Sequence, residues 1–178
     1  WGRVPVALEA RDRDLRARAA VPFQGTGAMH ASIINGGREL SSYPDSCTLQ
    51  MERRTVAAED EAVVTAEMEG ILARLRQEDP EFEATARVTG FRSAYCLDPG
   101  HRLPQALAGS LGGGGRSAEP VGMSFWTDAA ILAGAGIPSL LFGPGGAGLH
   151  SVVEYVNLDD VYVCRDILCE TVNRLMTA

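Results

Sequence analysis

Lysine is absent from this sequence, so all sixteen basic side chains among its 178 residues are arginines. Alanine and glycine are abundant, and we attribute this combined bias to a GC-rich genome rather than to function. The formal net charge of −7 argues against a nucleic-acid partner, because binding to phosphates needs a basic surface. No apolar run is long enough to cross a bilayer, and no charged-then-apolar leader opens the sequence. We therefore expect a cytoplasmic protein with no membrane partner.

Cysteine and histidine are also scarce. The four cysteines form no CxxC pair and no metal-binding spacing, and we interpret them as core residues in a reducing compartment. His30 lies within an expected strand and His101 in a linker, and we interpret both as structural. The sequence contains no HxxxH, no HxD and no adjacent pair of glutamates. It therefore shows no recognisable set of the three protein ligands that a catalytic zinc requires.

The first half of the chain predicts one sheet layer covered by helix. Residues 1–20 are charged and weakly amphipathic, like the remainder of a helix. Residues 29–37 and 45–55 alternate in polarity and predict two strands, and residues 82–91 predict a third. Between the second and third strands, residues 59–77 have helical spacing, so the order resembles most of a split βαβ sandwich. The apolar positions are Cys47, Leu49 and Met51 in the second strand, and Val64, Met68, Ile71, Leu72 and Leu75 in the helix.

The second half has a different pattern. After a glycine-rich link and a short helix near residues 104–111, Thr127 is placed to cap a helix that ends at Gly136. Residues 137–143 are apolar throughout, which predicts a strand buried on both faces. Asn157 is placed to cap a last helix, and together these elements resemble one edge of a doubly wound domain. The apolar stripe expected on that helix is Val161, Cys164, Leu168, Val172 and Leu175.

His150 lies in the glycine-rich loop that follows the expected buried strand. In doubly wound sheets, ligands bind beyond the carboxyl ends of the strands, where this loop would lie. One interpretation is therefore a metal-ligand histidine whose ring is oriented by Glu154 or by the hydroxyl of Ser151. The other is a surface residue in a flexible turn, and residue types alone favour that second interpretation.

Two groups of motifs, in a fixed order, resemble a known family. In the first half they are Gly36-Gly37, Pro44-Asp45, and Glu52 with Arg54. In the second half they are Thr127-Asp128-Ala129, Gly136-Ile137-Pro138, Gly143-Pro144-Gly145, and His150 with Glu154-Tyr155-Val156. These stretches are similar to the C-terminal part of the acetylornithine deacetylase, succinyl-diaminopimelate desuccinylase, aminoacylase and carboxypeptidase family of metallopeptidases. Ser41 departs from the family pattern, because many members have an asparagine before the Pro-Asp turn.

The resemblance implies a domain plan and a set of roles. Residues 1–26 would be a residual helix and link, residues 27–92 a partial ferredoxin-like lid, and residues 93–178 the C-terminal edge of a doubly wound zinc-peptidase domain. The implied site residues are His150 as a metal ligand, Arg54 as the anchor for a substrate carboxylate, Gly143 and Gly145 as pocket wall, and Glu154 as a brace for the histidine. The alternative for Arg54 is a solvated charge at a strand end.

The resemblance also implies a function. Family members cleave N-acyl amino acids or small peptides with a hydroxide bound to a pair of zinc ions, and they form homodimers through the lid. Their other metal ligands and the glutamate base belong to an N-terminal half that does not occur in this sequence. We therefore assign no catalytic residue, and we expect a truncated deacetylase-like fragment that is inactive alone. The alternative is a non-catalytic dimerisation module or a degenerate remnant.

Overall fold

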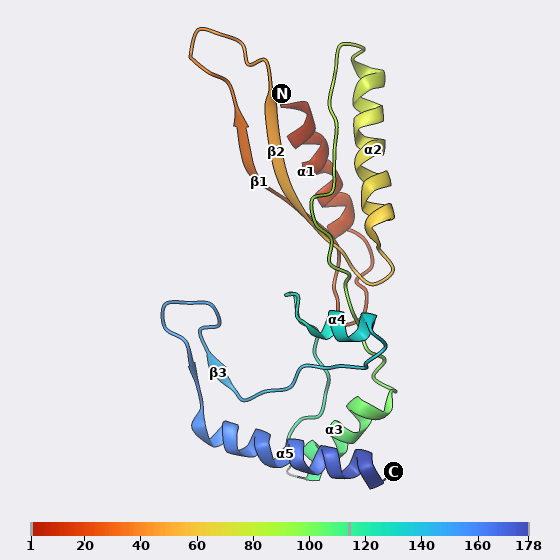
Figure 1. The fold of residues 1–178 in the computed structure, drawn as a ribbon, viewed down its shortest axis with the longest axis vertical. Helices are drawn as coiled ribbons and strands as arrows, with labels where there is room; N and C mark the ends of the chain where they lie inside the picture. The colour runs from red at the N-terminus through yellow and green to blue at the C-terminus, as the bar shows by residue number, and fades with distance from the viewer. Residues whose placement is uncertain (1, 114, 178) are drawn as a thin grey trace. The chain divides into compact units, whose positions relative to one another are not determined.

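The computed structural model describes residues 2–113 and 115–177, which form two compact units of a mixed α/β fold (Figure 1). The first unit contains the residues up to Ala94 together with Gly122–Ser124. The second contains Tyr95–Val121 together with the residues from Phe125 onward. Within the described residues, no helix is both long and apolar enough to span a membrane.

The first unit is built from two helices and one hairpin. Helix α1 spans Arg3–Arg16, and strands β1 (Ala28–Gly36) and β2 (Cys47–Arg54) pair antiparallel, with Ala28 opposite Arg54. Helix α2 spans Glu61–Glu78, and the Asp60 side chain caps it by accepting a hydrogen bond from the Val63 amide at 2.9 Å. The two strands and the long helix were predicted from periodicity, and the structure confirms them.

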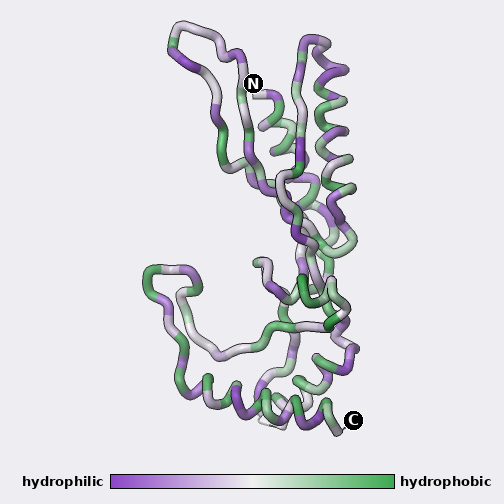
Figure 2. The backbone as a smooth tube through the Cα atoms, in the orientation of Figure 1, coloured by the Kyte–Doolittle hydropathy of each residue, from purple (hydrophilic) through white to green (hydrophobic). Residues whose placement is uncertain are grey.

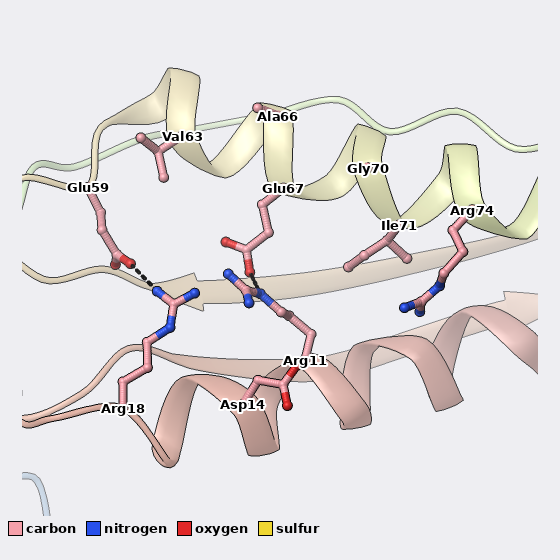
Figure 3. A pocket seen from close by; sticks show the side chains of 10 residues that line it. All are labelled: Arg11, Asp14, Arg18, Glu59, Val63, Ala66, Glu67, Gly70, Ile71 and Arg74. Atoms are coloured by element: carbon pink, nitrogen blue, oxygen red, sulfur yellow. Dashed lines mark hydrogen bonds and ion pairs between the residues drawn. The ribbon is translucent and has the colours of Figure 1, made fainter.

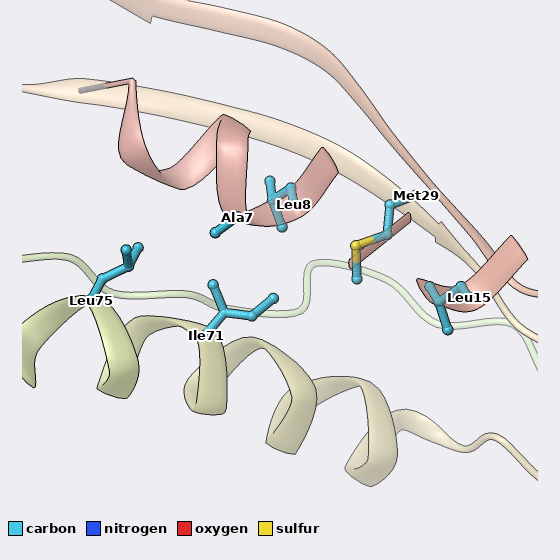
Figure 4. Close-up of a cluster of buried hydrophobic side chains, with 6 residues drawn as sticks. All are labelled: Ala7, Leu8, Leu15, Met29, Ile71 and Leu75. Atoms are coloured by element: carbon cyan, nitrogen blue, oxygen red, sulfur yellow. The ribbon is translucent and has the colours of Figure 1, made fainter. Parts of the chain in front are cut away.

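Helix α1 packs against both β1 and α2 and so holds this unit together. Figure 4 shows the core between these elements, and Leu15 is its one completely buried large side chain among the described residues. On the sheet side, Asp12 accepts a hydrogen bond from the Met29 amide at 2.8 Å, which ties α1 to the start of β1. Hydrogen bonds from Arg16 and from the Met29 amide lower the pKa of Asp12. The core residues are Ala7, Leu8, Leu15, Met29, Ile71 and Leu75.

Polarity alternates along these elements as the sequence predicts (Figure 2). In β2 the expected inward residues Cys47, Leu49 and Met51 are half-buried, while the residues between them are exposed. In α2 the expected stripe faces the core, and Met68 packs at its margin. The buried members of that stripe are Val64, Ile71, Leu72 and Leu75.

The third strand predicted for this unit does not form. Among the described residues of the first unit, the sheet has two strands, and residues 82–91 belong to no strand. Phe82 does pack against the core, and Arg76 of α2 donates a hydrogen bond to the Ala84 carbonyl. The alternating pattern therefore predicted the inward side chain of Phe82 correctly. The backbone of this segment, however, is bonded by the Arg76 side chain rather than by a neighbouring strand.

The second unit is organised around two helices. Helix α3 (Arg102–Gly113) packs against α5 (Leu158–Thr177), and the buried Thr171 hydroxyl donates a hydrogen bond to the Ser110 hydroxyl at 3.1 Å. Between them in the sequence come the short helix α4 (Ala129–Gly134) and the two-residue strands β3 (Gly146–Ala147) and β4 (Tyr155–Val156). The two strands pair antiparallel. The helices near residues 104–111 and 157–176 are confirmed.

Three details of the second unit differ from expectation. Residues 137–143 form no strand, and Ile137 and Leu141 are about half exposed, because no neighbouring strand pairs with this segment among the described residues. The N-cap position of α4 is Asp128 rather than Thr127, and no described side chain caps it. On α5 the buried positions are Ile167 and Thr171, so the apolar stripe that we predicted is offset by about one residue.

Candidate functional site

Arg54 ends β2, and its guanidinium lies at the surface of the first unit. Its Nη1 donates a hydrogen bond to the Ser124 carbonyl at 2.9 Å, and its Nε lies 3.3 Å from a carboxylate oxygen of Glu52. The side chain is 45% exposed, so its donors are accessible to a ligand. A guanidinium is a planar fork of donors, which matches the two oxygens of a carboxylate better than an ammonium does.

The next residue back, Arg53, points the opposite way and is 4% exposed. Its Nη2 donates to Glu59 at 2.9 Å, and its Nε donates to Glu67 at 3.2 Å. Burial works against ionisation of Glu59, but hydrogen bonds from Arg53 and the Val56 amide outweigh it and lower the pKa of that carboxyl. We did not predict this network. A signal was present, because the alternation of β2 places a charged residue at the inward position after Met51.

A groove lies between α1 and α2 beside this network (Figure 3). In Figure 3 Glu59 faces Arg18 and Glu67 faces Arg11 across the groove. Its charged lining is three arginines and three carboxylates: Arg11, Arg18, Arg74, Asp14, Glu59 and Glu67. Balanced charge favours neither a cationic nor an anionic ligand, and none of the site residues predicted from the sequence lines the groove.

His150 belongs to the second unit and lies in the turn that joins β3 to β4. Its side chain is exposed, and its backbone has φ +61°, in the left-handed region that non-glycine residues seldom occupy. The turn is closed by a hydrogen bond from the Ser151 amide to the Gly148 carbonyl at 2.8 Å. Left-handed backbone at a non-glycine residue is one mark of functional positions, and here it coincides with the predicted ligand.

The glycines of this loop have local structural reasons to be glycine. A Cβ on Gly146 would lie 2.1 Å from the Tyr155 carbonyl oxygen, and one on Gly148 would lie 1.8 Å from the Val153 carbonyl oxygen. A Cβ on Gly145 would lie 2.8 Å from a carboxylate oxygen of Asp160, and the Gly145 carbonyl accepts a hydrogen bond from the Asn157 amide at 2.9 Å. These glycines let β3 approach β4 and the start of α5, which sets where the His150 turn projects.

Gly143 and Glu154 have fewer contacts. A Cβ built on Gly143 meets no described atom within 4 Å, so this position is open. Glu154 is exposed, and no hydrogen bond joins it to His150 in the described part of the chain. The pocket-wall role of Gly143 and the bracing role of Glu154 therefore stay predictions.

The described residues include no group of three or more histidine, cysteine, aspartate or glutamate side chains that could hold a metal ion. His150 supplies one nitrogen donor, whereas catalytic zinc uses about three protein ligands. This chain's described residues therefore do not form a zinc site by themselves. Any such site would need further ligands.

Comparisons with known proteins point to a common family, although no family model matches the sequence. The chain is 26% identical over 168 residues to an acetylornithine deacetylase of Myxococcus xanthus, covering 94% of this chain and 42% of that protein. It is 27% identical over 160 residues to the N-formyl-4-amino-5-aminomethyl-2-methylpyrimidine deformylase of Bacillus subtilis (strain 168). That match covers 82% of this chain and 38% of that protein.

A similar fold occurs in the aminopeptidase PepT from Bacillus cereus ATCC 10987, with a TM-score of 0.74 and 16% sequence identity. That match covers 96% of this chain and 45% of that one, so the chain spans less than half the length of each of these relatives. Together with its two motif groups in family order, these similarities along most of the chain support a relationship to the metallopeptidase family of acetylornithine deacetylases, succinyl-diaminopimelate desuccinylases, aminoacylases and carboxypeptidases.

Proposed function

We propose that this chain is part of a metal-dependent amidohydrolase that cleaves N-acyl amino acids or small peptides. The observation that carries the proposal is the similarity to an acetylornithine deacetylase along 94% of the chain. The other two relatives are named as a deformylase and an aminopeptidase, and all three names describe removal of a group from nitrogen. Hydrolysis of a C–N bond in a small substrate is the chemistry that these names share.

In this proposal the two units have different tasks. Within the first unit, residues 27–92 correspond to part of a ferredoxin-like lid that dimerises, and Arg54 reaches from it to the substrate carboxylate. The exposure of Arg54 and its position at the end of β2 support this role. The second unit corresponds to the C-terminal edge of a doubly wound catalytic domain in the cytoplasm, with Gly143 and Gly145 as pocket wall.

His150 is the residue that we propose for the metal. Its exposed ring and its left-handed backbone, in a turn shaped by glycines, support the role of a ligand presented to a site. Zinc would need at least two more protein ligands beside it, and the described residues provide no cluster of them. We therefore assign to this chain one ligand, one substrate anchor and no general base.

One observation favours a second candidate function. The described residues hold no metal-binding cluster, which is also what a non-catalytic dimerisation module would show. The two functions differ in whether His150 has a chemical role, because only the enzyme uses it. Measuring the turnover of the His150→Ala variant in a longer polypeptide that carries the other ligands distinguishes the two functions.

Zinc titration by calorimetry, with an assay of N-acetyl amino acid hydrolysis, tests the proposal on the 178-residue chain. We expect weak zinc binding and no hydrolysis, because a single imidazole gives no chelation. In a longer polypeptide that carries the missing ligands, His150→Ala should abolish turnover, and Arg54→Ala should mainly raise KM for substrates with a carboxylate.

His101→Ala is the matched control, since the imidazole of His101 accepts a hydrogen bond from the Leu103 amide. Turnover in the longer polypeptide should survive that change. Full turnover in His150→Ala would contradict the enzyme and favour the module. A tight zinc site in the 178-residue chain, lost in His150→Ala, would show that the chain holds further ligands.

A further inference from the structure

Arg53 is a buried charged residue that the proposed function does not use. All three nitrogens of its guanidinium have acceptors: Nε bonds Glu67, Nη2 bonds Glu59, and Nη1 bonds the main-chain carbonyl of Arg54. Removing a partner from a buried charge is destabilising, whereas a fully paired one imposes a single geometry on its neighbours. Arg53 therefore fixes the backbone from which the Arg54 side chain projects.

Both carboxylates of the network are themselves held by α1 or by the residues just after it. Arg11 of α1 pairs with Glu67, and Arg18 lies 3.7 Å from Glu59 (Figure 3). Glu59 also accepts a hydrogen bond from the Val56 amide at 3.1 Å, which closes the turn after β2. The end of β2 is thus tied through Arg53 to both helices of this unit.

The main chain opposite Arg54 leaves space for this arrangement. Gly27 is buried and immediately precedes Ala28, the residue that pairs with Arg54 across the hairpin. A Cβ on Gly27 would lie 2.5 Å from Nη1 of Arg53 and 3.1 Å from the Arg54 carbonyl oxygen. A side chain at position 27 would therefore displace the guanidinium from that carbonyl, so the glycine and the arginine form one arrangement.

We propose that Arg53 is a positioning residue for Arg54, which it holds ready to capture a carboxylate. The inference rests on the proposed function in one respect, namely that Arg54 binds the substrate carboxylate. A binding group that is already fixed loses less conformational freedom when its ligand arrives, and so binds it more tightly. Loosening Arg53 should weaken carboxylate binding although every donor of Arg54 remains.

The test uses NMR of the 178-residue chain in which all nitrogens are isotopically labelled, so that backbone amides and arginine side chains are both observed. Two quantities are measured: the order parameter of the Thr55 amide, whose nitrogen is bonded to the Arg54 carbonyl carbon, and the shift of the Arg54 Nε–Hε resonance on titration with N-acetylglycine. Arg53→Lys keeps the positive charge but lacks the fork that reaches three acceptors. We expect it to lower the order parameter and to weaken N-acetylglycine binding about twofold to tenfold, the range for immobilising one further side chain on binding.

Arg38→Lys is the matched control, since Arg38 forms an exposed ion pair with Asp45 near the tip of the hairpin. It should change neither quantity. If Arg53→Lys prevents folding, Gly27→Ala decides instead, because it retains every charge and displaces chiefly the guanidinium, with a smaller shift needed at the Arg54 carbonyl oxygen. We expect the same loosening of Thr55 in that variant.

The possible outcomes separate the two proposals. An unchanged Thr55 order parameter in a folded Arg53→Lys or Gly27→Ala chain overturns the role of Arg53. An Arg54 resonance in the unsubstituted chain that does not respond to N-acetylglycine counts against the carboxylate anchor in the proposed function, while the order parameter still decides on Arg53. Loss of order together with weaker binding supports both.

Discussion

Gly136 illustrates how one backbone conformation ends an element. Its φ is +78°, its amide donates to the Ala133 carbonyl at 2.9 Å, and the Ile137 amide donates to the Leu132 carbonyl at 2.9 Å. These two bonds form the Schellman arrangement that terminates many helices, with glycine in the left-handed position. The sequence predicted this helix end correctly because glycine is the residue that adopts positive φ without steric penalty.

Gly136→Ala should therefore destabilise the second unit by about 1–2 kcal/mol, the strain of a left-handed Cβ. A Cβ at this position would meet no described atom within 4 Å, so strain alone sets the effect. Gly134→Ala is the control, since that position is helical and equally open, and the change should stabilise by up to about 1 kcal/mol. Urea unfolding measures the stability of both variants, and equal effects would contradict the role of Gly136 as the left-handed residue that ends α4.

Glu59 makes the stability of the first unit depend on pH. Its folded-state pKa lies below the ordinary value of 4.5, so its stabilising contribution is present above that value and is lost as pH falls through the folded-state pKa. Arg53 and Arg18 are the cations that face it. We expect Glu59→Gln to lower the free energy of unfolding near neutral pH and to flatten its decline under acid conditions.

The measurement is the free energy of urea unfolding at a series of pH values on both sides of 4.5. Glu83→Gln is a suitable control, because Glu83 is exposed in the segment after α2. An acid slope that stays the same in Glu59→Gln would mean that this carboxyl carries no linked protonation.

Among the helices, α5 shows where a hydrophobic pattern is ambiguous. Its apolar side chains cover more than one face, and α3 selects the face that contains Ile167 and Thr171. Leu168, which the sequence pattern placed inward, is 48% exposed. The helix was predictable from its own residues, whereas the face that it buries depends on the partner.

Truncation of two adjacent residues tests this orientation. Ile167→Ala should destabilise the second unit by about 2–4 kcal/mol, because it leaves a cavity against α3. Leu168→Ala, one position along, should cost less than about 1 kcal/mol. Denaturant unfolding of the two variants gives the comparison. A larger loss of stability in Leu168→Ala than in Ile167→Ala would support the stripe predicted from the sequence instead.

Strands were harder to predict than helices for a physical reason. A helix satisfies its backbone hydrogen bonds internally, so α2 was predictable from spacing and its acidic first turn. A strand needs a neighbouring strand, and residues 82–91 and 137–143 have the side-chain pattern of strands but pair with no other strand among the described residues. For the same reason β1 and β2 were predicted correctly, because each supplies the other's partner.

The candidate site was predictable only as separate residues. The motifs located Arg54 and His150, and the structure places one at a strand end and the other in a strained turn. Contacts between residues distant in sequence, such as those of Arg53 with Glu67, leave no motif and required the fold. The structure also shows that a Cβ at Gly145 would crowd the Asp160 carboxylate, which the sequence alone did not indicate.

For the whole molecule, the proposed lid predicts that the chain associates with a second copy of itself. The sheet of the first unit consists of β1 and β2, so each of these strands has one edge without a pairing partner in the described residues. Exposed edges favour pairing with another chain, and β1 also exposes apolar Ile33 and Ile34. We expect the 178-residue chain to form a homodimer through this sheet, as part of the proposed function.

Sedimentation equilibrium over a range of protein concentrations measures the association. Ile34→Lys should shift the chain toward monomer, because a lysine on an edge strand opposes pairing between sheets. Val6→Lys is the control: Val6 is 63% exposed on α1, so this variant removes a comparable apolar side chain away from the edge and should leave association unchanged. A monomer for the unsubstituted chain at high micromolar concentration would contradict the homodimer. Equal weakening by both variants would instead mean that association follows general surface hydrophobicity, and the sheet edge would lose its role as the interface.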